Sequence, residues 1–204
     1  GHQIAVDLAA ATRIPVINAL TDLSHPCQAM ADFLTLREHK GALAGLKLAY
    51  VGDGNNVAHS LILAAARGGT KIAIGTPAGY GPNPRIVQMA REDGKDTGFE
   101  VVLTNSPEEA VSGADAVYTD VWASMGQEAE KEKRAAIFAP FQVNARLMSQ
   151  AKKDALFMHC LPAHRGDEVT DEVIDSPNSV VYDEAENRLH AQKAILTLLM
   201  GKKR

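Results

Sequence analysis

The sequence has few cysteines, a small net charge and no long apolar run, and each absence excludes a class of protein. Its two cysteines, Cys27 and Cys160, lie far apart and match no metal-ligand spacing, which also favours a reducing compartment. The net charge of -4 leaves no basic surface for nucleic acid, and no apolar run approaches a membrane span. We therefore expect neither a nucleic-acid nor a membrane partner. The 204 residues, 46% hydrophobic and 23% charged, have the composition of an ordinary globular protein.

The chain also lacks an initiator methionine and a signal peptide at its start. It begins Gly1-His-Gln-Ile4 and runs directly into a helical pattern of apolar residues through Ala9. Such a start is typical of the interior of a domain. We therefore expect a fragment or a processed chain, for which the missing signal carries no information on targeting.

Apolar segments alternate with helical patterns from residue 46 onward. The expected strands are residues 46–51, 71–75, 100–103, 114–120, 155–158 and 180–182. The expected helices between and after them are residues 56–67, 84–92, 107–112, 128–138, 144–150, 170–175 and 184–200. Before residue 46, the pattern predicts a helix, a short strand at 15–18, and a helix from 25 to about 39 with Ser24 as its N-cap and Gly41 at its end. This alternation predicts an α/β fold, a Rossmann-like open parallel sheet with helices on both faces.

The turn Val51-Gly-Asp-Gly-Asn-Asn-Val-Ala58 half-matches the dinucleotide-binding pattern. Gly52 would permit the tight turn and Gly54 a close approach of another backbone. However, Val57 stands in place of the third glycine, and the next strand ends without an acidic residue for a ribose. The turn therefore favours a small anion at a helix N-terminus over NAD, with Asn55 and Asn56 either contacting the anion or capping the helix.

Polar residues also follow the ends of two other expected strands. Asp120 ends one strand and the run His159-Cys-Leu-Pro162 ends another. Ligands of open α/β sheets bind at the carboxyl ends of the strands, so these residues are candidates for a binding site. His25 and Gln28 are three residues apart and would face one way from a helical turn, as a donor pair for a carbonyl and an amide.

Five motifs occur together and in order: His25-Pro-Cys-Gln28, Gly52-Asp-Gly-Asn-Asn56, Asp120-Val-Trp-Ala-Ser-Met-Gly126, His159-Cys-Leu-Pro162 and Glu184-Ala-Glu-Asn-Arg188. With them, the chain resembles the ornithine carbamoyltransferase family over essentially its whole length. The resemblance implies transfer of a carbamoyl group from carbamoyl phosphate to the δ-amine of L-ornithine, giving L-citrulline and phosphate, in arginine metabolism. It implies a cytoplasmic homotrimer or a multiple of trimers, and no metal or organic cofactor.

The resemblance also implies a division into domains. Residues 1–24 would end a carbamoyl-phosphate-binding α/β domain, of which only a remnant is present, because its Ser-Thr-Arg-Thr-Arg phosphate loop does not occur in the sequence. Residues 25–40 would form a linking helix, 41–183 the ornithine-binding domain, and 184–204 a helix that returns to the first domain. We therefore expect these 204 residues alone to be inactive or nearly so.

Roles for individual residues follow from the same resemblance. The residues expected at carbamoyl phosphate are His25, Pro26, Cys27, Gln28, Cys160, Leu161 and Arg188. The residues expected at ornithine are Asn56, Asp120, Ser124 and Met125. Cys160 and Asp120 would polarise the δ-amine or accept its proton, and His25 and Arg188 would donate to the oxyanion.

Three other interpretations stay open. A related carbamoyltransferase would use putrescine or an acylated ornithine, although the Ser124-Met-Gly126 loop favours ornithine itself. An NAD-dependent oxidoreductase would use the same kind of sheet. A noncatalytic ornithine-binding fragment would follow from the missing phosphate loop.

Overall fold

A parallel sheet forms the centre of the computed structural model, which describes residues 1–123 and 130–201. The strands are β1 (Lys47–Val51), β2 (Lys71–Gly75), β3 (Val101–Thr104), β4 (Ala116–Thr119) and β5 (Leu156–His159). Their order in the sheet is β3-β2-β1-β4-β5, and every pair is parallel. The chain therefore leaves β1 toward one edge of the sheet and later returns to the opposite side of β1. This places a topological switch point between β1 and β4, as in other doubly wound folds.

Helices connect the strands and cover both faces of the sheet. They are α1 (His2–Ala11), α2 (Pro26–Lys40), α3 (Asn56–Gly68), α4 (Pro84–Asp93), α5 (Pro107–Val111), α6 (Lys131–Phe138), η2 (Ala139–Phe141), α7 (Ala145–Met148), α8 (Asp171–Ile174) and α9 (Val181–Met200). The predicted open parallel sheet with helices on both faces is confirmed.

Alternating side chains of the strands build one apolar core on each face of the sheet. On β1, Leu48 and Tyr50 join the core formed with α2, α3 and α4, whereas Ala49 and Val51 join the core formed with α5, α7 and α8. Strands β1, β2, β4 and β5 are buried on both faces, which explains why they appear in the sequence as short unbroken apolar runs, whereas the edge strand β3 is partly exposed.

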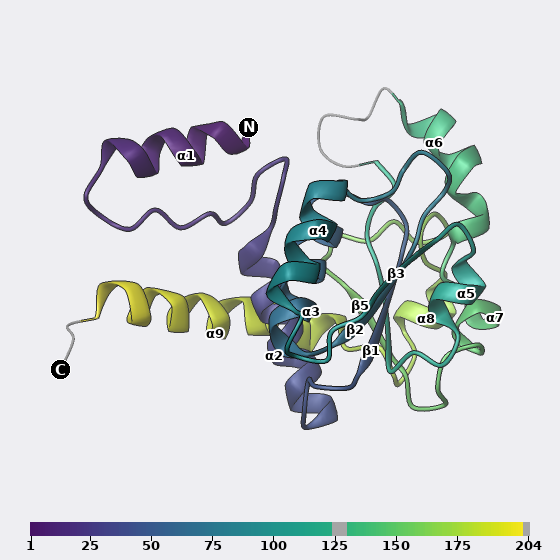
Figure 1. Cartoon of the computed structure of the whole chain (residues 1–204). Helices are drawn as coiled ribbons and strands as arrows, with labels where there is room; N and C mark the ends of the chain where they lie inside the picture. The colour runs from purple at the N-terminus through teal and green to yellow at the C-terminus, as the bar shows by residue number, and fades with distance from the viewer. Residues whose placement is uncertain (124–129, 202–204) are drawn as a thin grey trace.

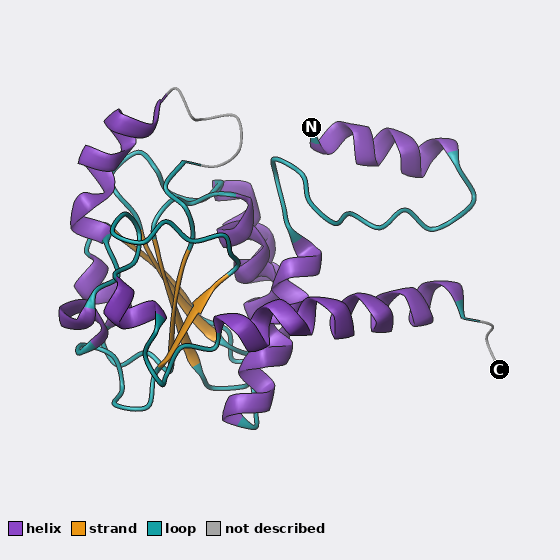
Figure 2. Cartoon of the chain, turned by 180° about the vertical axis from the view of Figure 1, so that it is seen from behind, coloured by secondary structure: helices purple, strands orange, loops and turns teal. Residues whose placement is uncertain are grey.

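The first and last helices extend away from the sheet (Figures 1 and 2). α1 has no buried residue, and apolar side chains on it and on the distal part of α9 are exposed, among them Ile4, Leu8, Leu196 and Leu198. None of the described helices is both long and apolar enough to cross a membrane.

Three local predictions are wrong. Residues 15–18 form no strand, since they have no ladder partner among the described residues. The strand predicted at residues 180–182 is instead the start of α9, whose first residue is Val181. The acidic pair that follows favours a helix N-terminus over a strand. Ser24 does not cap α2; His25 holds the N-cap position, and the Ser24 hydroxyl accepts from Asn18 Nδ2 at 3.0 Å instead. Gly41 does end α2, with φ of 80°.

Candidate functional site

A cavity of about 780 Å³ lies at the carboxyl ends of β1, β4 and β5, at the topological switch point. The turns after these strands, residues 20–25 and the start of α6 supply its wall. Its described lining residues are Leu20, Thr21, Asp22, His25, Asp53, Asn55, Asn56, Val57, Asp120, Val121, Trp122, Ala123, Ala135, Cys160, Leu161, Pro162, His164, Asp167 and Glu168. The prediction that polar residues from separate strand ends meet at one site is therefore confirmed for Asp120 and Cys160.

The turn between β1 and α3 forms one wall of this cavity. Gly52 has a φ of 144°, a conformation that L side chains rarely adopt. Gly54 N–H donates to the Tyr80 carbonyl at 2.8 Å, and a Cβ on Gly54 would lie 2.3 Å from Pro82 N. The close approach that the sequence predicts at Gly54 thus exists, but the partner is the chain's own backbone, which argues against a pyrophosphate there. Asn55 caps α3, with its Oδ1 accepting from the N–H groups of Val57 and Ala58.

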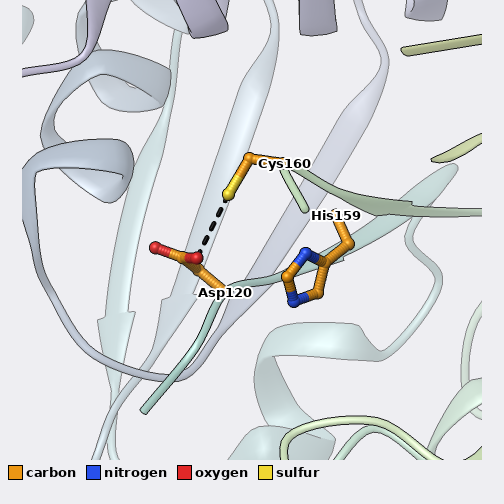
Figure 3. Close-up of side chains that lie close together, drawn as sticks. All are labelled: Asp120, His159 and Cys160. Atoms are coloured by element: carbon orange, nitrogen blue, oxygen red, sulfur yellow. Dashed lines mark hydrogen bonds between the residues drawn. The ribbon is translucent and has the colours of Figure 1, made fainter. Parts of the chain in front are cut away.

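Asp120 and Cys160 face each other across the ends of β4 and β5 (Figure 3). The Cys160 thiol donates to Asp120 Oδ1 at 3.1 Å, and Asn55 Nδ2 donates to Asp120 Oδ2 at 2.7 Å. Burial raises the pKa of Cys160 well above its usual value, and the Asp120 charge raises it further. The thiol is therefore neutral and acts as a donor here, so Asp120 is the better candidate for accepting a proton.

His25 reaches the cavity from the N-terminus of α2. Burial is the largest cause of its lowered pKa, against the effect of its bond to the Ala19 carbonyl, so the imidazole is neutral at pH 7. Because that carbonyl can only accept, Nδ1 carries the proton, at 2.6 Å from the Ala19 oxygen. Nε2 is then an acceptor, which favours a contact with an amide N–H over donation to an oxyanion.

Gln28 and Arg188 are not among the described lining residues of the cavity, and the pairing of His25 with Gln28 as donors stays a prediction. The Gln28 amide is buried, and Arg188 Nη1 donates to its Oε1. Pro26 and Cys27 are also absent from the cavity wall. The Cys27 thiol lies 3.5 Å from the Asn18 carbonyl, and burial raises its pKa.

The residues predicted at ornithine fall into two groups. Asp120 and Asn56 line the cavity, and Asn56 Nδ2 donates to the Thr21 carbonyl at 2.7 Å. Ser124 and Met125 lie outside the described residues. The roles assigned to all these residues stay predictions.

Two features in or directly behind the cavity wall were not predicted. Arg134, on α6, forms an ion pair with Asp53 and donates to the Trp122 carbonyl. Burial raises the pKa of Asp53, and Arg134 opposes that shift. Glu168 is fully buried, and its Oε1 lies 3.2 Å from His159 Nε2. In the sequence these residues stand in polar, charge-rich stretches that are typical of solvated surface, so no local signal marks them.

Two groups of side chains place possible metal ligands within 4.8 Å of one another: Asp120, His159 and Cys160, and His164, Asp167 and Glu168. In the first group each side chain already has a hydrogen-bond partner, because the thiol donates to Asp120 and His159 Nδ1 accepts from Leu161 N–H at 2.9 Å. The expectation that no metal is needed stays a prediction.

The fold and the cavity define an open α/β domain with a polar cavity at its switch point, and comparison with known proteins identifies the family. The pattern described as "Aspartate/ornithine carbamoyltransferase, Asp/Orn binding domain" matches residues 44–199. The pattern described as "Aspartate/ornithine carbamoyltransferase, carbamoyl-P binding domain" matches residues 1–38. The chain belongs to the aspartate/ornithine carbamoyltransferase family, which confirms the resemblance.

Individual relatives agree with this assignment. The chain is 58% identical over 200 residues to an ornithine carbamoyltransferase of Thermococcus kodakarensis, covering 98% of this chain and 64% of the relative. The solved ornithine carbamoyltransferase of Pyrococcus furiosus superposes with a TM-score of 0.96 at 57% identity, covering 100% of this chain and 65% of that one. The Giardia lamblia structure, at 34% identity, still gives a TM-score of 0.92, covering 100% of this chain and 68% of that one. The chain thus spans 64% of the length of its curated Thermococcus relative.

Proposed function

We propose that this chain contributes the ornithine site of an ornithine carbamoyltransferase, which transfers the carbamoyl group of carbamoyl phosphate to the δ-amine of L-ornithine. The observation that carries the proposal is the charge of the cavity. Five carboxyl side chains line it, and its described lining includes no lysine or arginine; one of the five, Asp53, is paired with Arg134 behind the wall, so acidic groups remain in excess. Ornithine, with two ammonium groups, is the kind of substrate that such a wall attracts.

Asp120 is the residue to which we assign the reacting amine. Its two oxygens accept from Asn55, Val121 N–H and the Cys160 thiol, and a carboxylate has lone pairs left for an ammonium group. The δ-amine must lose its proton before its nitrogen can attack the carbonyl carbon of carbamoyl phosphate. Asp120 is buried and within reach of that proton, so it serves as the general base or hands the proton on.

The α-carboxylate of ornithine would lie near Asn56, on the side of the α3 N-terminus. The N-terminus of α3 begins there, and helix N-termini favour negative charge. On the carbamoyl side, His25 Nε2 would accept from the carbamoyl amide. Attack forms the new C–N bond, the C–O bond to phosphate breaks, and citrulline and inorganic phosphate leave.

The wider context belongs to the same proposal. We keep the assignment of Arg188 to carbamoyl phosphate, the four-part division of the chain, the homotrimer and the cytoplasmic location as predictions that rest on family membership.

Ligand binding is tested by calorimetry on this chain with L-ornithine, putrescine and NAD. We expect weak ornithine binding that Asp120→Asn removes, whereas Asp96→Asn, which changes an exposed carboxylate, leaves it unchanged. Tight binding of NAD without ornithine binding would contradict the proposal. Equal affinity for putrescine would show that the α-carboxylate is not recognised.

The transfer reaction is tested in a chimera in which this chain replaces the matching part of the Pyrococcus furiosus relative. Formation of citrulline that stops with Asp120→Asn supports the assignment. A chimera that folds like the relative and makes no citrulline would argue against it. This chain by itself should make little or no citrulline, because it does not contain the phosphate loop.

A further inference from the structure

Two carboxyl groups meet behind the cavity, where α2 crosses α9. Asp32 lies on α2 and Glu184 on α9, and both are fully buried. Neither lines the cavity, and the function proposed above gives neither a role.

Glu184 accepts more hydrogen bonds than Asp32 does. Gln28 Nε2 donates to both, to Asp32 Oδ1 at 2.8 Å and to Glu184 Oε1 at 3.2 Å. Glu184 also accepts from the Tyr118 hydroxyl and from His159 N–H, each at 3.1 Å. Asp32 Oδ2 is buried and has no hydrogen-bond partner among the described residues.

Two adjacent carboxylates that are both fully buried cannot both be ionised at ordinary pH. Burial raises the pKa of Asp32 to about 7 and raises that of Glu184 well above its usual value, with the repulsion between them adding to the latter. Arg188 is the cation that acts on this pair, and Tyr118 and Cys160 also face it. Glu184 accepts from three donors whereas Asp32 Oδ2 has none, so one proton shared by the two carboxyl groups would give the orphaned oxygen a partner.

We propose that Asp32 and Glu184 form a positioning pair that shares one proton and fixes the orientation of Gln28 and Arg188. With its Nε2 bound by both carboxyl groups, the Gln28 amide can turn only one way, so its Oε1 faces Arg188. Gln192, in the amide orientation that satisfies both of its polar atoms, accepts from Arg188 Nε and Nη2 at 3.1 and 3.0 Å. The guanidinium is thereby held from two sides.

The functional part of this inference rests on the proposed function, in which Arg188 contacts carbamoyl phosphate. An arginine held in advance loses less conformational freedom when a phosphate binds, so the pair should act on the affinity for carbamoyl phosphate rather than for ornithine. Glu184 and Asp32 touch neither ligand and act through Gln28 and Arg188.

Infrared spectroscopy tests the shared proton in this chain. At about pH 6, exposed carboxyl groups are ionised, so a C=O stretch of a protonated carboxylic acid reports a buried pair. We expect one such band in the wild-type chain. Asp32→Asn and Glu184→Gln should each remove or shift it, because either change takes away one of the two carboxyl groups that share the proton. Glu38→Gln is the matched control: Glu38 also joins α2 to α9, accepting from Asn187 at 2.7 Å, and the band should not change. No band in the wild type, or a band that neither pair variant alters, would overturn the proposal.

Kinetics of the chimera test the positioning. Glu184→Gln should raise the KM for carbamoyl phosphate about tenfold while the KM for ornithine stays within about twofold. Equal changes in both KM values would indicate general damage and contradict the role. If the wild-type chimera is inactive, the proposed function fails, and the Nε–H NMR signal of Arg188 in this chain decides the positioning: it should be sharp in the wild type and lost in Glu184→Gln.

Discussion

Replacement of Arg134 by methionine should strongly destabilise the cavity wall. The arginine side chain is 5% exposed and its partner Asp53 is 13% exposed, so the ion pair is almost completely removed from water. The guanidinium also donates to the Trp122 carbonyl and lies 5.0 Å from the ring centroids of both Tyr80 and Phe138. Methionine retains much of the apolar contact but leaves the Asp53 carboxylate buried and unpaired. Loss of one partner of a buried pair costs about 3–5 kcal/mol, a large part of the stability of a typical domain.

The cost should depend on pH in a defined direction. Burial already raises the pKa of Asp53, and Arg134 is the group that opposes this shift. Without Arg134 the pKa of Asp53 in the folded chain rises further above its value in the unfolded chain. A raised folded-state pKa means that stability is fully present below the unfolded value and is lost as pH increases through the folded value. The variant should therefore be least destabilised near about pH 4 and most destabilised near about pH 7.

Urea unfolding followed by tryptophan fluorescence measures this directly, because Trp122 is the single tryptophan and contacts Arg134. Arg91→Met, which changes an exposed arginine of α4, is the control and should cost less than about 0.5 kcal/mol. In the Arg134→Met background, Asp53→Asn should restore part of the lost stability, since it removes the buried, unpaired charge of Asp53. A loss below about 1 kcal/mol, or additive losses in the double variant, would refute the reasoning.

Two further predictions concern the reaction in the chimera. Asp120→Asn should lower kcat/KM for ornithine, because an ion pair to the amine is lost, and the loss of transition-state stabilisation should be on the order of 2–4 kcal/mol. Steady-state kinetics with an unchanged kcat/KM would exclude this role. The value of kcat/KM for ornithine should rise with pH between about 6 and 9, because attack needs the neutral amine, whose unperturbed pKa is near 10.4; a flat profile would show that deprotonation is not required.

The sheet could be predicted from the sequence because four of its strands, β1, β2, β4 and β5, are buried on both faces, and all five appear as short apolar runs between helical patterns. The same signal failed at Val180 and Val181, where two β-branched residues begin a helix. Their burial comes from contact with the sheet, and burial alone does not distinguish a strand from the first turn of a helix. Residues 15–18 failed for a different reason, since a strand needs a neighbour and the described residues offer none.

The site could be predicted as far as strand order determines it. Asp120 and Cys160 follow β4 and β5, which are neighbours, so their side chains meet. The position of Gln28 could not be predicted in this way. Spacing places it on one side of α2, but whether that side faces the cavity or α9 depends on how the last helix crosses the second. The pairing of Asp53 with Arg134 could not be predicted either, because the two residues are 81 apart in sequence and meet only through the position of α6 in the fold.

Gly54→Ala tests whether the turn between β1 and α3 is shaped by packing against its own chain. A Cβ at residue 54 would lie 2.3 Å from Pro82 N and 2.4 Å from the Gly81 carbonyl carbon, and both are backbone atoms that cannot rotate away. We expect a loss of about 3 kcal/mol or more in the free energy of unfolding. Gly79→Ala is the control, because its φ of 85° adds strain of about 1–2 kcal/mol while no atom lies within 4 Å of its Cβ. Gly54→Ala should also weaken ornithine binding, since Asp53 and Asn55 line the cavity on either side of it. If Gly54→Ala is no less stable than Gly79→Ala, the backbone contact does not shape this turn, and the argument that it leaves no room for a pyrophosphate fails with it.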